Sequence, residues 1–238
     1  MSQLSQIQCC LKRHLAVRAY YYLRVLLPGR CRWLRLGFSN GMDSMLQFMK
    51  IVGQLKRVPR TGWVYRNVKK PESVSDHMYR MSMMALTIKD VTVSRERCVK
   101  MALVHDLAES IVGDIAPADN VSKEEKHRRE KEAMVHITGL LEDGLRNEIY
   151  NLWEEYENQS TPEAKLVKEL DQLEMIIQAH EYEELEGKPG RLQEFFTSTE
   201  GNFRHPEVLG LIKSLNEERA RHIAEKGDSD HEKSIPSS

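Results

Sequence analysis

Residues 102–109 read ALVHDLAE and place an imidazole beside a carboxylate within an apolar run. Burying His105 and Asp106 without partners would be costly, and a bound divalent cation is one way to satisfy both groups. Glu109 follows His105 by four residues, so in a continuous helix the two side chains share a face. A His-Asp dipeptide is common, however, and a hydrogen-bonded ion pair inside a helical core explains it equally well.

Apolar residues recur at helical spacing on both sides of this run. Upstream, the spacing predicts a helix over about residues 43–55, followed by a loop over residues 58–74 that contains proline and glycine. Ser75 and Ser94 are expected to cap the next two helices, the second of which runs through residues 102–109. The segment around the His-Asp pair is therefore expected to be helical throughout.

The downstream half also has the signals of helices. Ser122 and Glu125 form a capping box that starts a charged helix, and Thr161, followed by proline, starts a longer one ending near residue 185. Two further helices are expected over about residues 145–157 and 205–224. No run of alternating residues predicts a sheet, so the expected fold class is all-α.

The composition changes along the chain. Residues 1–42 contain seven Lys and Arg and no acid, whereas the chain of 238 residues has a net charge of −1. The remainder is therefore acidic, which disfavours nucleic-acid binding because phosphate contacts rely on clustered basic residues. No window approaches 18 uncharged apolar residues, so neither a transmembrane helix nor a membrane partner is expected.

Three parts are expected on these grounds: a basic extension over residues 1–41, one helical domain over 42–225 and a disordered tail over 226–238. The favoured interpretation of the extension is an upstream segment from an alternative start, and a mitochondrial targeting segment is the alternative. Three of the four cysteines lie within the first 31 residues and form no paired framework through the body. That pattern favours a reducing compartment, and we expect the cytoplasm.

Further imidazole and carboxylate groups accompany the His-Asp pair. His77 lies near the start of the preceding helix, Asp171 lies inside an apolar-periodic helix far downstream, and Asp114 follows the pair within a short glycine-containing loop. Together they give the pattern H…HD…D, and Glu109 and Asp114 are additional candidate ligands. Mixed imidazole and carboxylate ligands suit Mn, Fe, Co, Zn or Mg.

This set resembles the metal-binding signature of the HD-domain phosphohydrolase superfamily. Longer strings resemble the HD-domain 5′-deoxynucleotidase family in particular: RVPRTGW at residues 57–63, PESVSDH at 71–77, ALVHDLAE at 102–109 and VGDI at 112–115. The similarity covers about residues 43–220 and does not extend to residues 1–40.

The resemblance implies a single HD-domain helical bundle that removes phosphate from deoxyribonucleoside 5′-monophosphates with a divalent cation, namely Mn, Co or Mg. It implies a homodimer and a first metal held by His77, His105, Asp106 and Asp171. It also implies a second cation held by Glu109, Asp114 and the backbone carbonyl of Ile115. Asp106 and Glu109 are the expected catalytic residues, with Glu109 orienting the attacking water or accepting its proton.

The substrate-binding loop departs from the family pattern. Bacterial relatives place an arginine directly before the loop tryptophan, but here Gly62 precedes Trp63. Arg60 and Arg66 are therefore both candidates for binding the phosphate. Trp63 either faces the sugar and excludes a 2′-hydroxyl, as the family implies, or packs the loop against the core.

The sequence is also compatible with three other functions. The chain could be a cyclic-nucleotide phosphodiesterase or a triphosphohydrolase of the same superfamily, although its acidic body holds a triphosphate poorly. It could also be a helical adaptor that keeps the metal for stability and turns nothing over. No role is expected for several histidines that match no ligand position of the family: His127, His136, His180, His205, His222 and His231.

Overall fold

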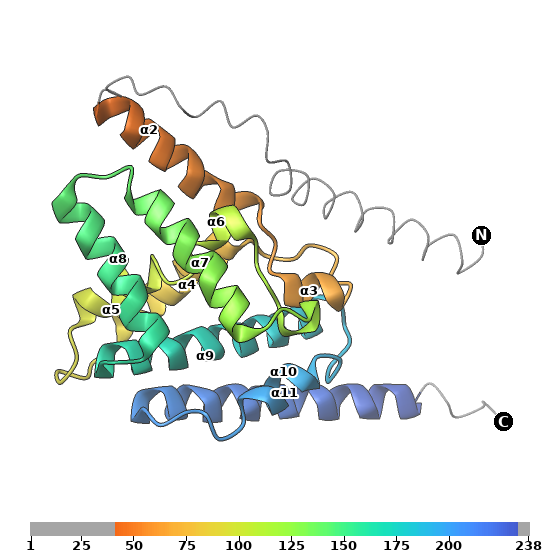
Figure 1. Ribbon diagram of the computed structural model, residues 1–238. Helices are drawn as coiled ribbons and strands as arrows, with labels where there is room; N and C mark the ends of the chain where they lie inside the picture. The colour runs from red at the N-terminus through yellow and green to blue at the C-terminus, as the bar shows by residue number, and fades with distance from the viewer. Residues whose placement is uncertain (1–40, 233–238) are drawn as a thin grey trace, which may run out of the picture. The chain divides into compact units, whose positions relative to one another are not determined.

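The computed structural model describes the backbone of residues 41–232 and the side chains of residues 41–225. Residues 41–232 belong to one compact unit (Figure 1). The helices are α2 Gly41–Val52, α3 Thr61–Tyr65, α4 Val74–Thr87, α5 Arg95–Ala102, α6 Glu109–Val112, α7 Lys123–Thr138, α8 Asp143–Asn158, α9 Pro162–Leu185, α10 Gln193–Thr199 and α11 Pro206–Glu232, with 3-10 turns at Gly53–Arg57 and Pro117–Asp119. Residues 41–232 contain no strand, which confirms the all-α expectation.

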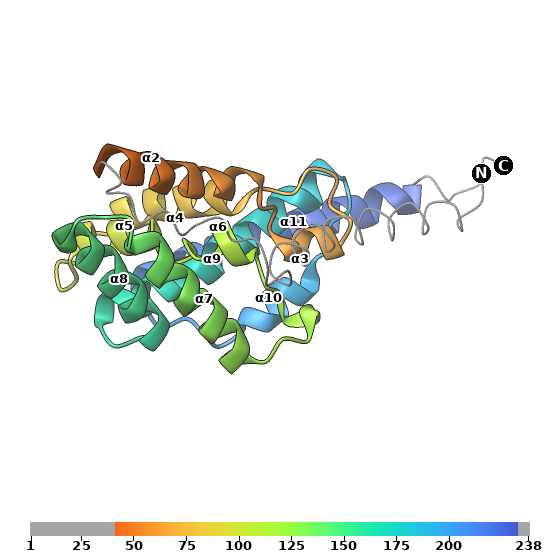
Figure 2. The same cartoon turned by 45° about the horizontal axis from the view of Figure 1, so that its top comes forward.

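Helix α9 is central to this unit and packs against α4, α5, α8, α10 and α11. Thr161 caps it by accepting a hydrogen bond from the amide of Ala164, and Pro162 occupies the first turn, as the sequence predicted. Leu170, Leu173 and Ile176 are among its fully buried side chains. Helix α2 packs on α6 and α7 on another side of the unit (Figure 2).

Helix α4 begins two residues earlier than a cap at Ser75 would give. Ser73 is the cap, because its hydroxyl accepts from the amide of Asp76 while the Asp76 carboxylate accepts from the amide of Ser73. The preceding segment is not a plain loop, since it contains α3. A bridge between Pro59 and Ser73 closes the segment at the base of α4.

The helix expected through residues 102–109 is interrupted. Helix α5 ends at Ala102, and residues 103–108 form turns before α6 begins at Glu109. Nδ1 of His105 lies 2.9 Å from the carbonyl oxygen of Ala102, and the backbone tightens to i→i−3 hydrogen bonds such as Leu107 to Val104. The expectation that His105 and Glu109 share the face of one continuous helix was therefore wrong.

The last helix is longer than expected. Helix α11 continues past residue 224 to Glu232, so its end falls within the segment assigned to the tail. Helix α10 was not predicted from the sequence. None of the described helices is both long enough and apolar enough to cross a bilayer. The expected basic extension lies outside the described residues, except for Gly41, where α2 begins.

Two clusters of buried apolar residues fill the unit. His77 and His105 lie where the two clusters meet. On α4, His77 is followed by Met78, which belongs to the smaller cluster, and by Met81, which belongs to the larger. Around His105, Val104 belongs to the larger cluster and Leu107 to the smaller. Apolar packing on both sides therefore fixes the positions of both imidazole rings.

Candidate metal centre and active site

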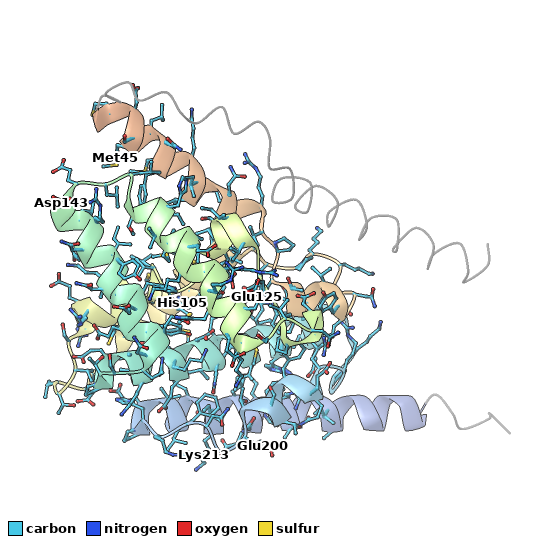
Figure 3. The ribbon with its side chains drawn as sticks, viewed as in Figure 1. Met45, His105, Glu125, Asp143, Glu200 and Lys213 are labelled. Carbon is cyan, nitrogen blue, oxygen red and sulfur yellow. The ribbon has the colours of Figure 1, made fainter. Side chains whose placement is uncertain are left out.

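Three ligand atoms from distant parts of the chain converge at the centre of the unit. His77 on α4, His105 in the turn after α5 and Asp171 on α9 each offer one atom, and these atoms lie within 4.8 Å of one another. Nε2 of His77 is 3.2 Å from Oδ1 of Asp171. Figure 3 shows His105 inside the bundle, whereas the labelled Asp143 and Lys213 lie at its edge.

Asp106 is the fourth member of this group. Its Oδ2 atom lies 3.2 Å from Nε2 of His105 and 3.9 Å from Nε2 of His77. The structure thus brings together all four residues that the H…HD…D pattern singled out. Two imidazoles and two carboxylates in one place are the donor set that a first-row divalent cation prefers.

The Nε2 atoms of His77 and His105 are the strongest evidence that this group fits a metal. Both side chains are fully buried. Although carboxylate oxygens lie nearby, neither nitrogen has a partner in hydrogen-bond geometry. A buried polar atom without a partner costs free energy, and a bound cation would satisfy both nitrogens at once.

Each imidazole is oriented by its other nitrogen. Nδ1 of His77 forms a hydrogen bond with Glu174, and Nδ1 of His105 forms one with the carbonyl oxygen of Ala102 at 2.9 Å. A carbonyl can only accept, so Nδ1 of His105 is the donor, and Nε2 is the nitrogen on the side of Asp106. Partners of this kind on the far side of the ring are typical of histidines that ligate metals.

Asp171 is oriented in the same manner. Its Oδ2 atom accepts hydrogen bonds from the hydroxyl of Tyr156 and the ammonium of Lys168, both at 2.8 Å, which leaves Oδ1 on the side of His77. Burial alone would raise the pKa of Asp171, but Lys168 and His77 together hold it well below its usual range. The carboxylate is therefore ionised and available as a ligand.

Asp106 is ionised for a similar reason. Burial opposes ionisation, but the imidazole of His105 and the guanidinium of Arg60 lower the pKa of Asp106 below its ordinary value. Both ligand carboxylates therefore carry negative charge at neutral pH, as binding of a divalent cation requires.

Glu109 is buried beside this group, and its pKa is shifted upward, whereas the pKa values of Asp106 and Asp171 are shifted downward. Burial, followed by the carboxylates of Asp106 and Asp114, raises its pKa well above the ordinary value. Its Oε2 atom is buried without a hydrogen-bond partner. The pKa of Glu109 is therefore shifted upward from that of a water-exposed glutamate, which makes it a candidate proton acceptor.

Asp114 and Ile115, the other two residues expected at a second cation, have protein partners. Oδ2 of Asp114 accepts a hydrogen bond from the amide of Thr61 at 2.6 Å, at the start of α3. The ammonium of Lys126 lies 3.3 Å from the carbonyl oxygen of Ile115. Asp114 thus holds the loop of residues 58–74 against the centre.

The structure separates the two candidate arginines. Nη1 of Arg60 lies 3.4 Å from Oδ2 of Asp106, and Nη2 lies 4.0 Å from Oδ1 of Asp171, with the side chain only 16% exposed. Burial would lower the pKa of Arg60, but Asp114 and Asp106 raise it. Arg66 instead forms two 2.6 Å hydrogen bonds with Glu194, so only Arg60 contacts the ligand carboxylates.

Trp63 is packed into the core of the loop. Its side chain is 2% exposed, and its indole lies against the rings of Phe195 and Tyr182, with centroids 4.4 and 5.3 Å away. Its Nε1–H donates to Glu72 at 2.9 Å. These contacts correspond to the packing interpretation of Trp63.

Sequence reasoning missed several groups that support the centre: Glu174, Arg80, Tyr156, Lys168 and Lys126. One of them left a signal in the sequence. Glu174 follows Asp171 by three residues within an apolar-periodic helix, so both carboxylates lie on one face of α9. Nothing in the sequence marks the others as supporting groups, because their placement depends on how the helices pack.

Comparison with known proteins shows the family to which the chain belongs. The family model described as HD domain matches residues 52–208. The 5′-deoxynucleotidase HDDC2 of Danio rerio is 86% identical over 187 residues, which cover 79% of this chain and 94% of that protein. The protein of the same name from Homo sapiens is 65% identical over 193 residues, covering 81% of this chain and 95% of that protein.

A solved structure shows the same fold. The PH0347 protein from Pyrococcus horikoshii OT3 superposes with a TM-score of 0.60 at 32% identity, covering 75% of this chain and 99% of that one. The family resemblance of the four sequence motifs is thereby confirmed. This chain belongs to the HD-domain family and, within it, to the family of the 5′-deoxynucleotidase HDDC2 proteins.

Proposed function

We propose that this protein hydrolyses deoxyribonucleoside 5′-monophosphates to a deoxyribonucleoside and phosphate, at the centre formed by His77, His105, Asp106 and Asp171. Its relatives from animals, Dictyostelium discoideum and fission yeast carry the name 5′-deoxynucleotidase. One observation carries the assignment to this centre. Two buried imidazole nitrogens without hydrogen-bond partners face two ionised carboxylates.

These four side chains would hold one divalent cation, and Mn, Co and Mg are the candidates that we propose. When bound, such a cation supplies Lewis acidity toward a phosphoryl oxygen and lowers the pKa of water. The chain prepares this site in advance, because Glu174 and the carbonyl of Ala102 fix the two rings and Lys168 fixes Asp171.

Glu109 is the proposed general base. Burial and the carboxylates of Asp106 and Asp114 raise its pKa, so it is a stronger proton acceptor than a water-exposed glutamate. The same carboxyl group, once protonated, can return the proton to the 5′-oxygen of the leaving nucleoside. Asp106 acts as a ligand, and its negative charge contributes to the raised pKa of Glu109.

Arg60 is the proposed phosphate-binding residue. Its guanidinium stands beside the ligand carboxylates, and it is held there by charge rather than by a bidentate partner of its own. A planar fork of donors stabilises the charge that develops on phosphoryl oxygens during hydrolysis. Lys126 and Lys168 add positive charge near the same carboxylates.

A second cation, held by Glu109, Asp114 and the carbonyl of Ile115, is a further part of the proposal. Asp114 raises the pKa of Glu109, so the two carboxylates lie close enough to repel each other. A second cation would relieve this repulsion, and it would compete with Lys126 for the carbonyl of Ile115. The homodimer and the cytoplasmic location stay predictions, which light scattering and cell fractionation can test.

The test is a phosphate-release assay on metal-free protein reloaded separately with Mn, Co and Mg. Mono-, tri- and cyclic nucleotides are compared, in ribo and deoxy forms, and we expect release from the deoxynucleoside monophosphates. Asp106→Ala should abolish release, whereas Asp143→Ala, an exposed acid on α8, should leave it unchanged. No release from any nucleotide with any of these metals would contradict the proposal and favour the helical adaptor.

A further inference from the structure

Two histidine–glutamate pairs face each other on α9 and α11, away from the centre described above. His180 and Glu184 lie four residues apart on α9, and Glu218 and His222 lie four residues apart on α11. Residues with this spacing project from the same face of a helix. Because α9 and α11 run side by side (Figure 1), the two pairs meet between them.

Three of these four side chains have donor atoms close enough to share one ion, and Glu218 approaches one of the three, His180. Nε2 of His180 lies 3.8 Å from Oε1 of Glu184 and 3.8 Å from Oε1 of Glu218. Nδ1 of His222 lies 2.9 Å from Oε1 of Glu184. Ligand atoms of His180, Glu184 and His222 all fall within 4.8 Å of one another.

His180 is buried with both ring nitrogens unsatisfied. Its side chain is 5% exposed, and neither Nδ1 nor Nε2 has a hydrogen-bond partner. The two carboxylate oxygens at 3.8 Å are too far away for hydrogen bonds. Nδ1 of His222 also lacks hydrogen-bond geometry, despite the short distance to Glu184. Both imidazoles therefore aim nitrogens at carboxylates without completing a bond.

The neighbouring contact fixes how the two helices face each other. Arg219, between Glu218 and His222, donates to both carboxylate oxygens of Glu183 at 2.8 and 3.0 Å. Both side chains of this ion pair are buried. A buried bidentate pair has one preferred geometry, so α9 and α11 cannot slide relative to each other without breaking it. The four donors are thus presented by a rigid frame.

We propose that His180, Glu184 and His222, with Glu218 as the fourth donor, form a zinc site that joins α9 to α11. Zinc takes imidazole nitrogen and carboxylate oxygen in tetrahedral sites with bonds of about 2.0–2.2 Å, which places neighbouring donors about 3.3–3.6 Å apart. The separations of 2.9 and 3.8 Å fall on either side of that spacing. Small side-chain rotations would bring His180, Glu184 and His222 to that spacing, and a rotation of Glu218 toward them would complete the site. The charge of the ion would match that of the two carboxylates.

The proposed site is independent of the catalytic centre and of the proposed reaction. It uses histidines that match no ligand position of the HD signature. A cation held between helices by i,i+4 donor pairs acts as a crosslink, so it should stabilise the packing of α11 on α9.

The test counts zinc on the full chain after dialysis against a zinc buffer. Since the catalytic centre can also bind zinc, the difference between variants is the informative quantity. We expect His222→Gln to bind one zinc fewer per chain than the wild type, with His136→Gln, an exposed histidine on α7, binding as the wild type does. Glu184→Gln should weaken zinc binding at the same site at least tenfold.

Thermal unfolding supplies a second readout, in an Asp106→Ala background that weakens the catalytic centre. Added zinc should raise the unfolding midpoint of this background by more than it raises that of the same background carrying His222→Gln. The His180→Gln variant should lose the same zinc-dependent shift, because it lacks the buried ligand. If His180→Gln does not fold, the result for His222→Gln decides between the outcomes. Equal zinc content and equal midpoint shifts with and without His222 would overturn the proposal.

Discussion

Glu174 pairs with Nδ1 of His77, and this contact turns Nε2 of the same ring toward the carboxylate of Asp171. Glu174 is fully buried and is held in turn by Arg80, whose Nε donates to it at 2.9 Å. Because Asp171 and Glu174 lie three residues apart on α9, one helix supplies both a ligand and the group that orients a ligand from α4. The metal centre therefore depends on how α4 packs against α9.

Glu174→Gln should weaken metal binding by about 10–100-fold, since loss of the group that orients a histidine ligand usually has this effect. The amide keeps the size of the side chain but no longer supplies a charged acceptor for His77. Titration calorimetry of metal-free protein with Mn measures the change. Glu181→Gln is the matched control, because Glu181 also pairs with Arg80 but does not touch His77. Equal affinities in the two variants would argue against an orienting role.

Arg60→Ala should lower kcat/KM for a deoxynucleoside monophosphate by about 10²-fold, the usual effect of removing one donor to a developing oxyanion. Arg66→Ala should change kcat/KM little, because Arg66 is engaged with Glu194 at the surface. Steady-state kinetics at saturating metal compares the two variants directly. A larger loss in the Arg66 variant would reverse the assignment of the phosphate-binding arginine.

Trp63→Ala should lower the free energy of unfolding by about 3–5 kcal/mol, as expected for a buried tryptophan truncated to alanine. The variant loses the contacts with Phe195 and Tyr182 and leaves Glu72 without its indole donor. Urea unfolding monitored by circular dichroism gives the value. Tyr79→Ala, at an exposed position of α4, is the control and should cost little. A loss below about 1 kcal/mol in the Trp63 variant would contradict the packing interpretation.

Glu130→Gln should change how stability depends on pH. Burial and the carboxylate of Glu157 raise the pKa of Glu130 to about 7 against the opposing charge of Lys126. Between pH 4.5 and 7 the folded state thus holds a proton that the unfolded state has released, so this group makes stability fall as pH rises. The variant should gain up to about 3 kcal/mol relative to wild type on going from pH 4 to pH 8.

Urea unfolding at several pH values measures this difference. Glu132→Gln, an exposed acid on the same helix, is the control and should follow the wild-type profile. A Glu130→Gln profile parallel to that of the wild type would show that Glu130 titrates normally.

Local sequence signals predicted most helix positions because caps and apolar spacing act within a few residues. Ser94, Ser122 and Thr161 accept the capping hydrogen bonds expected of them. Ser73 replaced Ser75 as the cap of α4, since the reciprocal bond with Asp76 is available only from Ser73. The break after Ala102 was missed because no proline or glycine marks it in the sequence; at the break, Nδ1 of His105 lies beside the carbonyl oxygen of Ala102.

At the site, the family resemblance identified His77, His105, Asp106 and Asp171 as the ligand set, whereas the His-Asp pair alone was explained equally well by an ion pair inside a helical core. The supporting groups could not be selected in this way. Whether Arg60 or Arg66 faces the centre depends on the turn at α3, and the pairing of Lys168 with Asp171 depends on a tertiary arrangement. Long-range packing, rather than composition, assigns those roles.

The most direct measurement is an anomalous diffraction map of crystals grown with Mn. We expect one peak between the four proposed ligands: Nε2 of His77, Nε2 of His105 and a carboxylate oxygen of both Asp106 and Asp171. Its distance to each of these atoms should be about 2.0–2.4 Å, the usual range of bonds to divalent cations. A fully occupied manganese elsewhere in the chain, with no peak between these four side chains, would contradict it.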